Sequence, residues 1–113
     1  MVKMKSEYVI MQKSHELEPD ASVSGKILDA VSTYYDIPID KIKAKDRVRD
    51  HVWCRQVFCY LCLKYTKLTL AEVGGKINRT HSNAIYSRRT VEDLMSTDQK
   101  KKKEVFVIEL KLI

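Results

Sequence analysis

The sequence of 113 residues has little glycine and proline, three and two residues respectively. Folds built from many short strands need frequent turns, in which these two residue types predominate. Their scarcity disfavours an all-β fold and favours a helical one. Long apolar runs are also missing, since no stretch approaches the roughly 20 apolar residues of a membrane-spanning helix. Residues 1–14 lack the apolar segment of a secretory signal, so we expect a cytoplasmic protein that does not enter a membrane.

Cysteine is scarce as well, and the three present, Cys54, Cys59 and Cys62, fall within one stretch. An odd number of cysteines without a secretory signal is typical of a reducing compartment. With His51 they have the residue types of a zinc site, but zinc ligands usually come from loops or knuckles. These cysteines fall at helical spacing, where a free thiol packs as a small hydrophobe, so we predict no metal and no cofactor. No orienting group or oxyanion donor accompanies a cysteine–histidine pair, so we predict no enzymatic activity.

Positive charge is concentrated in the centre of the chain, although its total is modest at +6. Residues 41–95 contain twelve lysines and arginines against five acidic residues, a balance of +7, and the rest of the chain sums to −1. A basic centre suits a polyanion such as DNA, because counterion release from phosphates supplies affinity. A mildly basic domain also serves solubility alone, so charge does not decide between the two.

A chain of this length forms one domain with a single modest core, and its first part is poorly patterned. Residues 1–21 show no sustained period, so we expect a loosely ordered arm, with a strand weakly indicated at residues 8–11. Apolar residues at helical spacing then predict a helix. Ser22 or Ser24 can cap this helix, and Asp36-Ile37-Pro38 ends it.

The middle of the chain is predicted to hold a central helix preceded by a basic loop. Pro38 at a first helical position indicates a short second helix. Residues 43–50 are too polar for a core element and are expected to form a basic loop. Residues 52–65 carry apolar side chains over a wide arc, which predicts the most buried helix of the domain.

Two capping signals mark the next pair of helices. Thr69-Leu70-Ala71-Glu72 is a capping box, in which the first and last residues satisfy each other's backbone N–H groups. The short helix that it opens is expected to end at Gly74-Gly75, where glycine tolerates a left-handed conformation. Thr80 can cap a further helix, which runs to about Met95.

The last segment, residues 99–113, is ambiguous between helix and strand from residue 104 onward. We predict a helix, because the chain offers no convincing strand with which it would pair. The predicted fold class is therefore all-α, a small helical bundle over residues 22–113 that contains a helix-turn-helix with a basic loop.

Two capped helices joined by a glycine-containing turn, over residues 69–95, form the pattern of a helix-turn-helix. The second helix of this motif lies in the major groove of DNA with its N-terminal residues against base edges. Each residue at that point of this chain can hydrogen-bond a base edge or a phosphate. They are Arg79, Thr80, His81, Ser82 and Asn83. Polar first turns are common on surface helices, so the motif alone does not establish DNA binding.

A second basic element, formed by Lys45, Arg47 and Arg49, lies about thirty residues earlier in the sequence. Arginine on a flexible loop is the usual reader of a narrow minor groove. Together with the polar start of the helix, this loop favours a protein that contacts duplex DNA in two grooves.

Five stretches share the order and the separations of a known family, with about one residue fewer in the turn near Asn78. They are Tyr34-Tyr35-Asp36-Ile37-Pro38, Lys45-Asp46-Arg47-Val48-Arg49, Arg55-Gln56, Leu70-Ala71-Glu72-Val73-Gly74 and Arg79-Thr80-His81-Ser82-Asn83. Through them the chain from about Ser24 to Leu112 resembles the C-terminal DNA-binding domain of the bacterial replication initiator DnaA. The resemblance implies sequence-specific binding of double-stranded DNA at a DnaA-box-like site, with one monomer per site, in replication initiation or its regulation.

The resemblance also implies a role for each matching residue. The minor-groove loop would contain Arg47, which enters the groove, with Arg49 at the backbone beside it, and Lys45 of the same loop is a further expected DNA contact. Phosphate contacts are implied for Arg55, Gln56 and the backbone around Leu70 and Ala71. Major-groove contacts are implied for His81, Ser82 and Asn83, and a supporting positive charge for Arg79 and Arg88.

The sequence departs from the family at positions that matter for DNA reading. Asp46 stands where members usually carry a basic residue, and Trp53-Cys54 where they carry a basic residue and a proline. Thr80 replaces an acidic residue that reads a base, and Asn83 replaces a threonine. Threonine cannot act as an acceptor-only partner for the amino group of cytosine, and asparagine favours adenine. The preferred site is therefore expected to differ from that of the family.

DnaA proteins carry an ATPase domain upstream of this region, whereas the 113 residues contain no Gly-x-x-x-x-Gly-Lys-[Ser/Thr] motif. We therefore predict no nucleotide site and expect either a fragment of an initiator or a stand-alone domain. Two alternatives stay open, a stand-alone helical module that binds a replication initiator or another protein, and a transcription regulator of phage or mobile-element origin.

Overall fold

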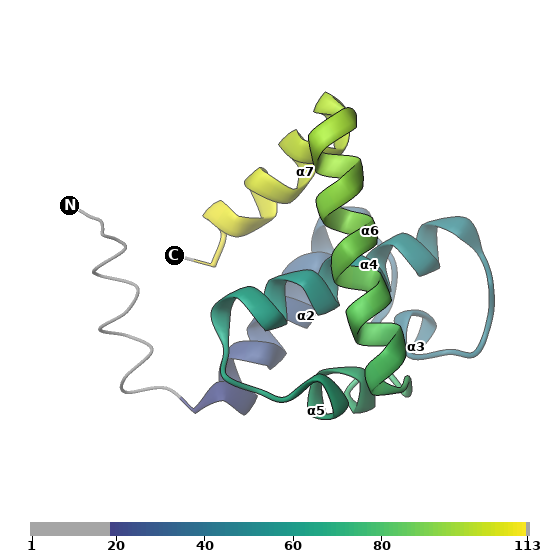
Figure 1. Ribbon diagram of the computed structural model, residues 1–113, viewed down its shortest axis with the longest axis vertical. Helices are drawn as coiled ribbons and strands as arrows, with labels where there is room; N and C mark the ends of the chain where they lie inside the picture. The colour runs from purple at the N-terminus through teal and green to yellow at the C-terminus, as the bar shows by residue number, and fades with distance from the viewer. Residues whose placement is uncertain (1–18, 113) are drawn as a thin grey trace.

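The computed structural model describes residues 19–112, so the predicted strand at residues 8–11 and most of the arm at residues 1–21 lie outside the described part. Within residues 19–112 the chain forms helices and no strand, which confirms the predicted all-α class (Figure 1). The helices are α2 (Asp20–Tyr35), α3 (Ile39–Ile42), α4 (Arg49–Tyr65), α5 (Leu70–Gly75), α6 (His81–Thr97) and α7 (Gln99–Leu110).

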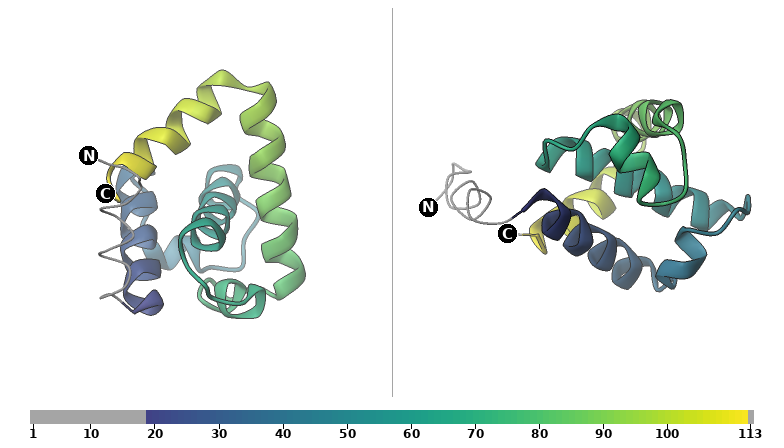
Figure 2. Two further views of the ribbon diagram at one scale, coloured as in Figure 1. Left: turned by 60° about the vertical axis from the view of Figure 1, so that its left-hand side comes forward. Right: turned by 90° about the horizontal axis from the view of Figure 1, so that it is seen from below.

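Helix α4 lies at the centre of the bundle, between α2 and α6, as the left view of Figure 2 shows. Helices α2, α3, α5 and α6 all pack against it. Its apolar residues Val57, Phe58 and Leu61 are fully buried, and so are its three cysteines. The wide apolar arc predicted for residues 52–65 is therefore confirmed as the core of the domain.

Helix α7 runs back from the end of α6 toward α2 (Figure 2). The Asp98 carboxylate, between the two helices, accepts hydrogen bonds from two backbone N–H groups in the first turn of α7, at 2.9 and 3.2 Å. Tyr35 Oη donates to Glu104 at 2.8 Å and accepts from Trp53 Nε1 at 2.7 Å, which joins α2, α4 and α7. The helix predicted over residues 99–113 is thus confirmed to the end of α7.

The first helix begins earlier than the sequence predicts. Helix α2 starts at Asp20, directly after the extended Pro19, and neither Ser22 nor Ser24 caps it. Ser24 is buried inside the helix, and its hydroxyl donates to a backbone carbonyl one turn earlier at 2.8 Å. Proline fixes the extended backbone that precedes a helix, which places the helix start ahead of both serines.

Three other boundaries also differ from the predicted ones. Pro38 is the N-cap of α3 and not its first residue. Helix α4 begins at Arg49, so the basic loop ends at Val48 and Arg49 belongs to a helix. Helix α6 continues to Thr97, past the predicted end at Met95. Capping signals are local, whereas the ends of a helix also adjust to the packing of its neighbours.

Both predicted capping arrangements around the helix-turn-helix are confirmed. The Thr69 hydroxyl accepts from the Glu72 backbone N–H at 3.1 Å, and the Glu72 carboxylate accepts from the Thr69 N–H at 2.8 Å. The Thr80 hydroxyl accepts from the Asn83 backbone N–H at 3.3 Å at the start of α6. These side chains fix where α5 and α6 begin.

The turn between α5 and α6 uses glycine for a reason other than the predicted one. Among the described residues no glycine has a positive φ, and the left-handed position in the turn is Asn78, with φ 59°. Gly74 lies under the end of the turn, where an added Cβ would be 2.5 Å from the Thr80 carbonyl oxygen and 2.8 Å from that of Arg79. Glycine is therefore needed for a close backbone approach.

We expect Gly74→Ala to lower the free energy of unfolding by about 1–3 kcal/mol, because the methyl group would push the turn away from α5. Urea unfolding followed by circular dichroism measures this change. Gly75→Ala is the matched control, since its Cβ would meet nothing within 4 Å and alanine favours a helix by up to about 1 kcal/mol. Equal effects of the two substitutions would contradict the close-approach explanation.

Candidate nucleic-acid interface

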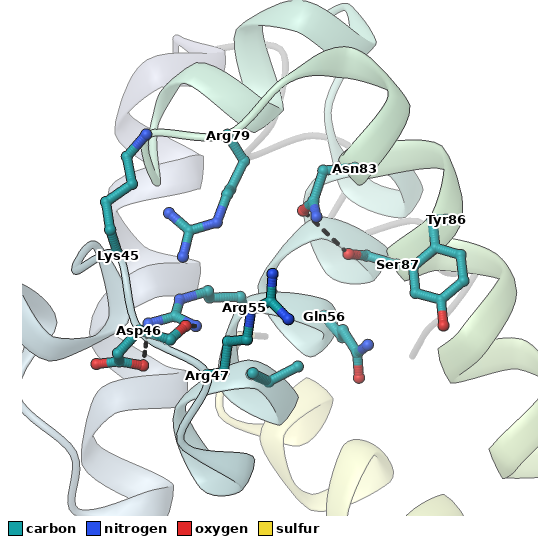
Figure 3. Close-up of a pocket in the computed structure, with 10 residues that line it drawn as sticks. Lys45, Asp46, Arg47, Arg55, Gln56, Arg79, Asn83, Tyr86 and Ser87 are labelled. Carbon is teal, nitrogen blue, oxygen red and sulfur yellow. Dashed lines mark hydrogen bonds and ion pairs between the residues drawn. The ribbon is translucent and has the colours of Figure 1, made fainter.

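A cleft of about 390 Å³ lies between the basic loop and helix α6, with α4 between them (Figure 3). Six of the residues predicted to contact DNA meet there, although they come from four separate segments of the chain. The residues that line the cleft are Lys45, Asp46, Arg47, Val52, Arg55, Gln56, Arg79, Asn83, Tyr86 and Ser87. The fold thus brings the loop and the start of α6 to one face of the domain.

Arg55 lies at the inner side of this cleft and is only 4% exposed. Its Nε donates to the Ile42 carbonyl at 2.6 Å, and Nη2 donates to the Lys41 carbonyl of α3 at 3.0 Å. In the basic loop, the Ala44 carbonyl accepts from Nη2 at 2.8 Å and the Asp46 carbonyl from Nη1 at 3.0 Å. Nη2 also forms an ion pair with the Asp46 carboxylate at 2.8 Å. The guanidinium is therefore directed inward, with its donors engaged by the protein itself.

Asp46 explains why Arg55 turns inward. A charged side chain is rarely buried unless it is paired, and the resemblance predicts a basic residue where this chain has an acidic one. The Asp46 carboxylate also accepts from His51 Nδ1 at 3.0 Å and from the Val48 backbone N–H at 3.3 Å. The hydrogen bonds from Arg55 and then from His51 hold the pKa of the Asp46 carboxyl well below its usual range.

The other polar side chains of the cleft differ in their exposure. Lys45 and Arg47 are exposed, and the Arg47 side chain extends from the loop into the cleft in Figure 3. Arg79 is half-buried, and Gln56 of α4 is partly exposed beside the cleft. A negatively charged group that entered the cleft would therefore meet donors from the loop and from α4.

The other predicted contact residues lie outside the cleft. Thr80, His81 and Ser82 are exposed at the start of α6, and Ala71 is exposed in the first turn of α5, beside the partly buried Leu70. The remaining two are cations in helices, Arg49 at the start of α4 and Arg88 further along α6. The first turns of α5 and α6 therefore lie in the helix-turn-helix, whereas Arg49 lies in α4.

The sequence did not single out Tyr86, which is one of the most exposed aromatic side chains at 64%. It lines the cleft together with Asn83 and Ser87. Residues three or four positions apart share one face of a helix. The three-residue spacing between Asn83 and Tyr86 was therefore the sequence signal that could have identified Tyr86. The structure adds Tyr86 to the surface that the sequence predicts.

Other kinds of site receive no support from the described residues. In residues 19–112 no group of three histidines, cysteines or acidic side chains is arranged to hold a metal ion. Burial raises the pKa of the Cys54 and Cys59 thiols to about 12, so neither is a thiolate at neutral pH. No helix in the described part has both the length and the apolar character to cross a membrane.

The compact α5–turn–α6 unit, seated on α4 and beside a basic loop, defines a helix-turn-helix protein. The family described as "Bacterial dnaA protein helix-turn-helix" matches residues 25–91. This chain belongs to that family, which confirms the resemblance seen in the sequence.

Proteins similar to this chain include chromosomal replication initiators. The chain is 34% identical over 87 residues to the "Chromosomal replication initiator protein DnaA" of Flavobacterium psychrophilum, covering 76% of this chain and 18% of that protein. It is 29% identical over 79 residues to "Chromosomal replication initiator protein DnaA 2" of Chlamydia pneumoniae, covering 70% of this chain and 18% of the relative. The chain spans less than a fifth of the length of these relatives.

We expect Asp46→Asn to destabilise the domain at neutral pH and to lose this effect in acid. Because the folded-state pKa lies below the ordinary value of about 3.9, the stability contributed by the carboxylate is complete above that value. It disappears as the pH falls toward the folded-state pKa. Urea unfolding of the parent and the variant from neutral to acidic pH measures the narrowing difference.

Asp29→Asn serves as the control for this pH series, because it removes the same charge from an exposed position on α2. The parent and Asp29→Asn should show closely similar pH profiles. If Asp29→Asn and Asp46→Asn changed the profile equally, the loss would reflect net charge and not the pairing with Arg55.

Proposed function

We propose that this chain binds double-stranded DNA sequence-specifically by contacting two neighbouring grooves. The first turn of α6 enters the major groove, and Arg47 enters the adjacent minor groove from the basic loop, residues 43–48. The observation that carries this proposal is the cleft between the loop and α6.

The two grooves of a duplex are separated by one sugar-phosphate strand, so a protein that reads both must leave room for that strand. The cleft supplies this room between the two reading elements, and Lys45 and Arg47 border it. Gln56 and the Tyr86 hydroxyl add uncharged donors. Contacts of this kind fix the register of a protein on DNA, whereas base contacts supply its specificity.

Base reading in the major groove falls to His81, Ser82 and Asn83, which follow the cap residue Thr80. An asparagine amide pairs in two-point fashion with adenine, whereas serine and threonine can address several bases. Since Thr80 and Asn83 differ from the residues usual in the family, we infer that the preferred site differs from the family's box.

Further contacts to the backbone complete the proposed interface. The start of α5, at Leu70 and Ala71, offers backbone N–H groups to a phosphate, and Arg49 and Arg88 supply positive charge. The printed names of the relatives describe chromosomal replication initiators, so we infer a role in replication initiation or its regulation, with one monomer at each site.

Selection from a random-sequence duplex library, followed by sequencing of the bound DNA, tests the proposal directly. We expect a short enriched site that contains adenine at a position read by Asn83. A parallel selection with Asn83→Thr should change the preference at that position and leave the others. Recovery of unenriched DNA by the parent protein would show that binding, if present, is not sequence-specific.

We expect the affinity for the selected duplex to fall steeply with salt. If five or six phosphates are neutralised, the plot of log affinity against log salt concentration should have a slope of about −4 to −6. Fluorescence anisotropy titrations across a salt series measure the slope. A nearly flat plot would exclude a phosphate-dominated interface.

We expect Arg47→Ala and His81→Ala each to weaken binding to the selected duplex by about 1–3 kcal/mol, as found for contacts that read bases. Lys103→Ala is the control, since it removes one charge from an exposed position on α7, far along the chain from both elements. Binding titrations at fixed salt measure the differences. Parent-like affinity of both interface variants would rule out the two-groove arrangement.

A further inference from the structure

Two side chains of the turn between α5 and α6 reach across to the basic loop. Asn78 Nδ2 donates to the Lys43 carbonyl at 3.1 Å, and Arg79 Nη2 donates to the Ala44 carbonyl at 2.8 Å. Each hydrogen bond joins segments that are 35 residues apart in the sequence. We call this pair of hydrogen bonds the loop–turn lock.

The lock shares an acceptor with the buried arginine of α4. The Ala44 carbonyl oxygen also accepts from Arg55 Nη2 at 2.8 Å, so one atom receives donors from α4 and from the turn. Burial, followed by the Arg55 charge, lowers the pKa of Arg79. Two guanidinium groups in such proximity repel each other, and carbonyl oxygens together with the Asp46 carboxylate offset this repulsion.

The Arg79 guanidinium is largely occupied by the protein itself. Besides the bond to the loop, Nη1 donates to the Ile77 carbonyl at 3.1 Å and to the Asn78 carbonyl at 3.2 Å. Both terminal nitrogens of the guanidinium thus donate to protein carbonyls. A side chain used in this way is poorly placed to give a phosphate a two-point contact.

We infer that Arg79 is a positioning residue, which fixes the basic loop relative to the first turn of α6 and thereby sets the width of the cleft. The residue lies between the two elements, at the start of α6, and its partner carbonyl immediately precedes Lys45 in the loop. Its effect on DNA binding rests on the proposed function, whereas its effect on the loop does not.

Fixing the loop before binding removes the need to order it on the DNA, and such preorganisation increases affinity. Without the lock, Arg47 would sample many positions relative to α6. Specific binding, which needs both elements in register, would weaken, whereas non-specific attraction to phosphates would change little.

Arg79→Lys is the decisive variant, because it keeps the charge. A lysine ammonium serves as a point charge for a phosphate but lacks the planar fork that reaches several carbonyls in fixed directions. If Arg79 positions the loop, Arg79→Lys should therefore lose that function. If Arg79 only contacts a phosphate, the lysine should preserve the contact. Asn78→Gly is the second variant, since glycine keeps the left-handed backbone at φ 59° and removes the other donor of the lock.

The state of the loop is measured first, without DNA. Nitroxide labels on Lys45→Cys and Arg89→Cys report the distance between the loop and α6 by double electron–electron resonance, because the three native cysteines are fully buried. We expect a broader distance distribution in Arg79→Lys and in Asn78→Gly than in the parent. Unchanged distributions in both variants would overturn the inference, and thermal unfolding shows whether each variant is folded.

Binding is then measured with the selected duplex and with an unrelated duplex. For Arg79→Lys we expect about a tenfold loss on the selected duplex, with parent-like affinity for the unrelated one and an unchanged salt slope. Parent-like specific affinity in Arg79→Lys, together with a slope reduced by about one in Arg79→Ala, would identify a phosphate contact and overturn the inference. If the parent lacked any preferred duplex, the proposed function would fail, and the distance measurement would still decide the lock.

Discussion

The face that carries the cleft depends on one buried cation. The Arg55 guanidinium donates hydrogen bonds to carbonyl oxygens at the end of α3 and along the basic loop. Buried backbone acceptors must be paired, and a buried charge is tolerated only with partners. Because Asp46 supplies the opposite charge, the loop, the cation and the carboxylate require one another, and the path of the loop follows from that requirement.

The core of α4 gives this arrangement its rigid base. Phe58 and Leu61 are fully buried on the same helix that carries Arg55, so the guanidinium is fixed to the best-packed element of the domain. Helices α2 and α6 lie on either side of α4 (Figure 2), and α7 is joined to α2 through the hydrogen bond from Tyr35 to Glu104. The loop and the helix-turn-helix are thus both held against α4, which is why residues distant in sequence reach one face.

Local signals predicted most of the helices, and contacts between distant segments account for what they missed. The Thr69 and Thr80 caps depend on neighbouring residues and were therefore predictable. The inward turn of Arg55 depends on an acceptor nine residues away and on carbonyls of an irregular loop, which no periodicity encodes. The role of Gly74 depends on the Thr80 carbonyl that lies over it, a close approach that exists only once α5 and α6 are packed.

The cap at Thr80 has a consequence for how such a domain can diversify. Its hydroxyl secures the start of α6 through the backbone N–H of Asn83, a group that every residue except proline possesses. His81 and Ser82 are exposed in the same turn, so their side chains contribute little to packing. The side chains at positions 81 and 82 are therefore free to vary without weakening the helix start, so the chemistry of this exposed turn can change while the scaffold stays intact.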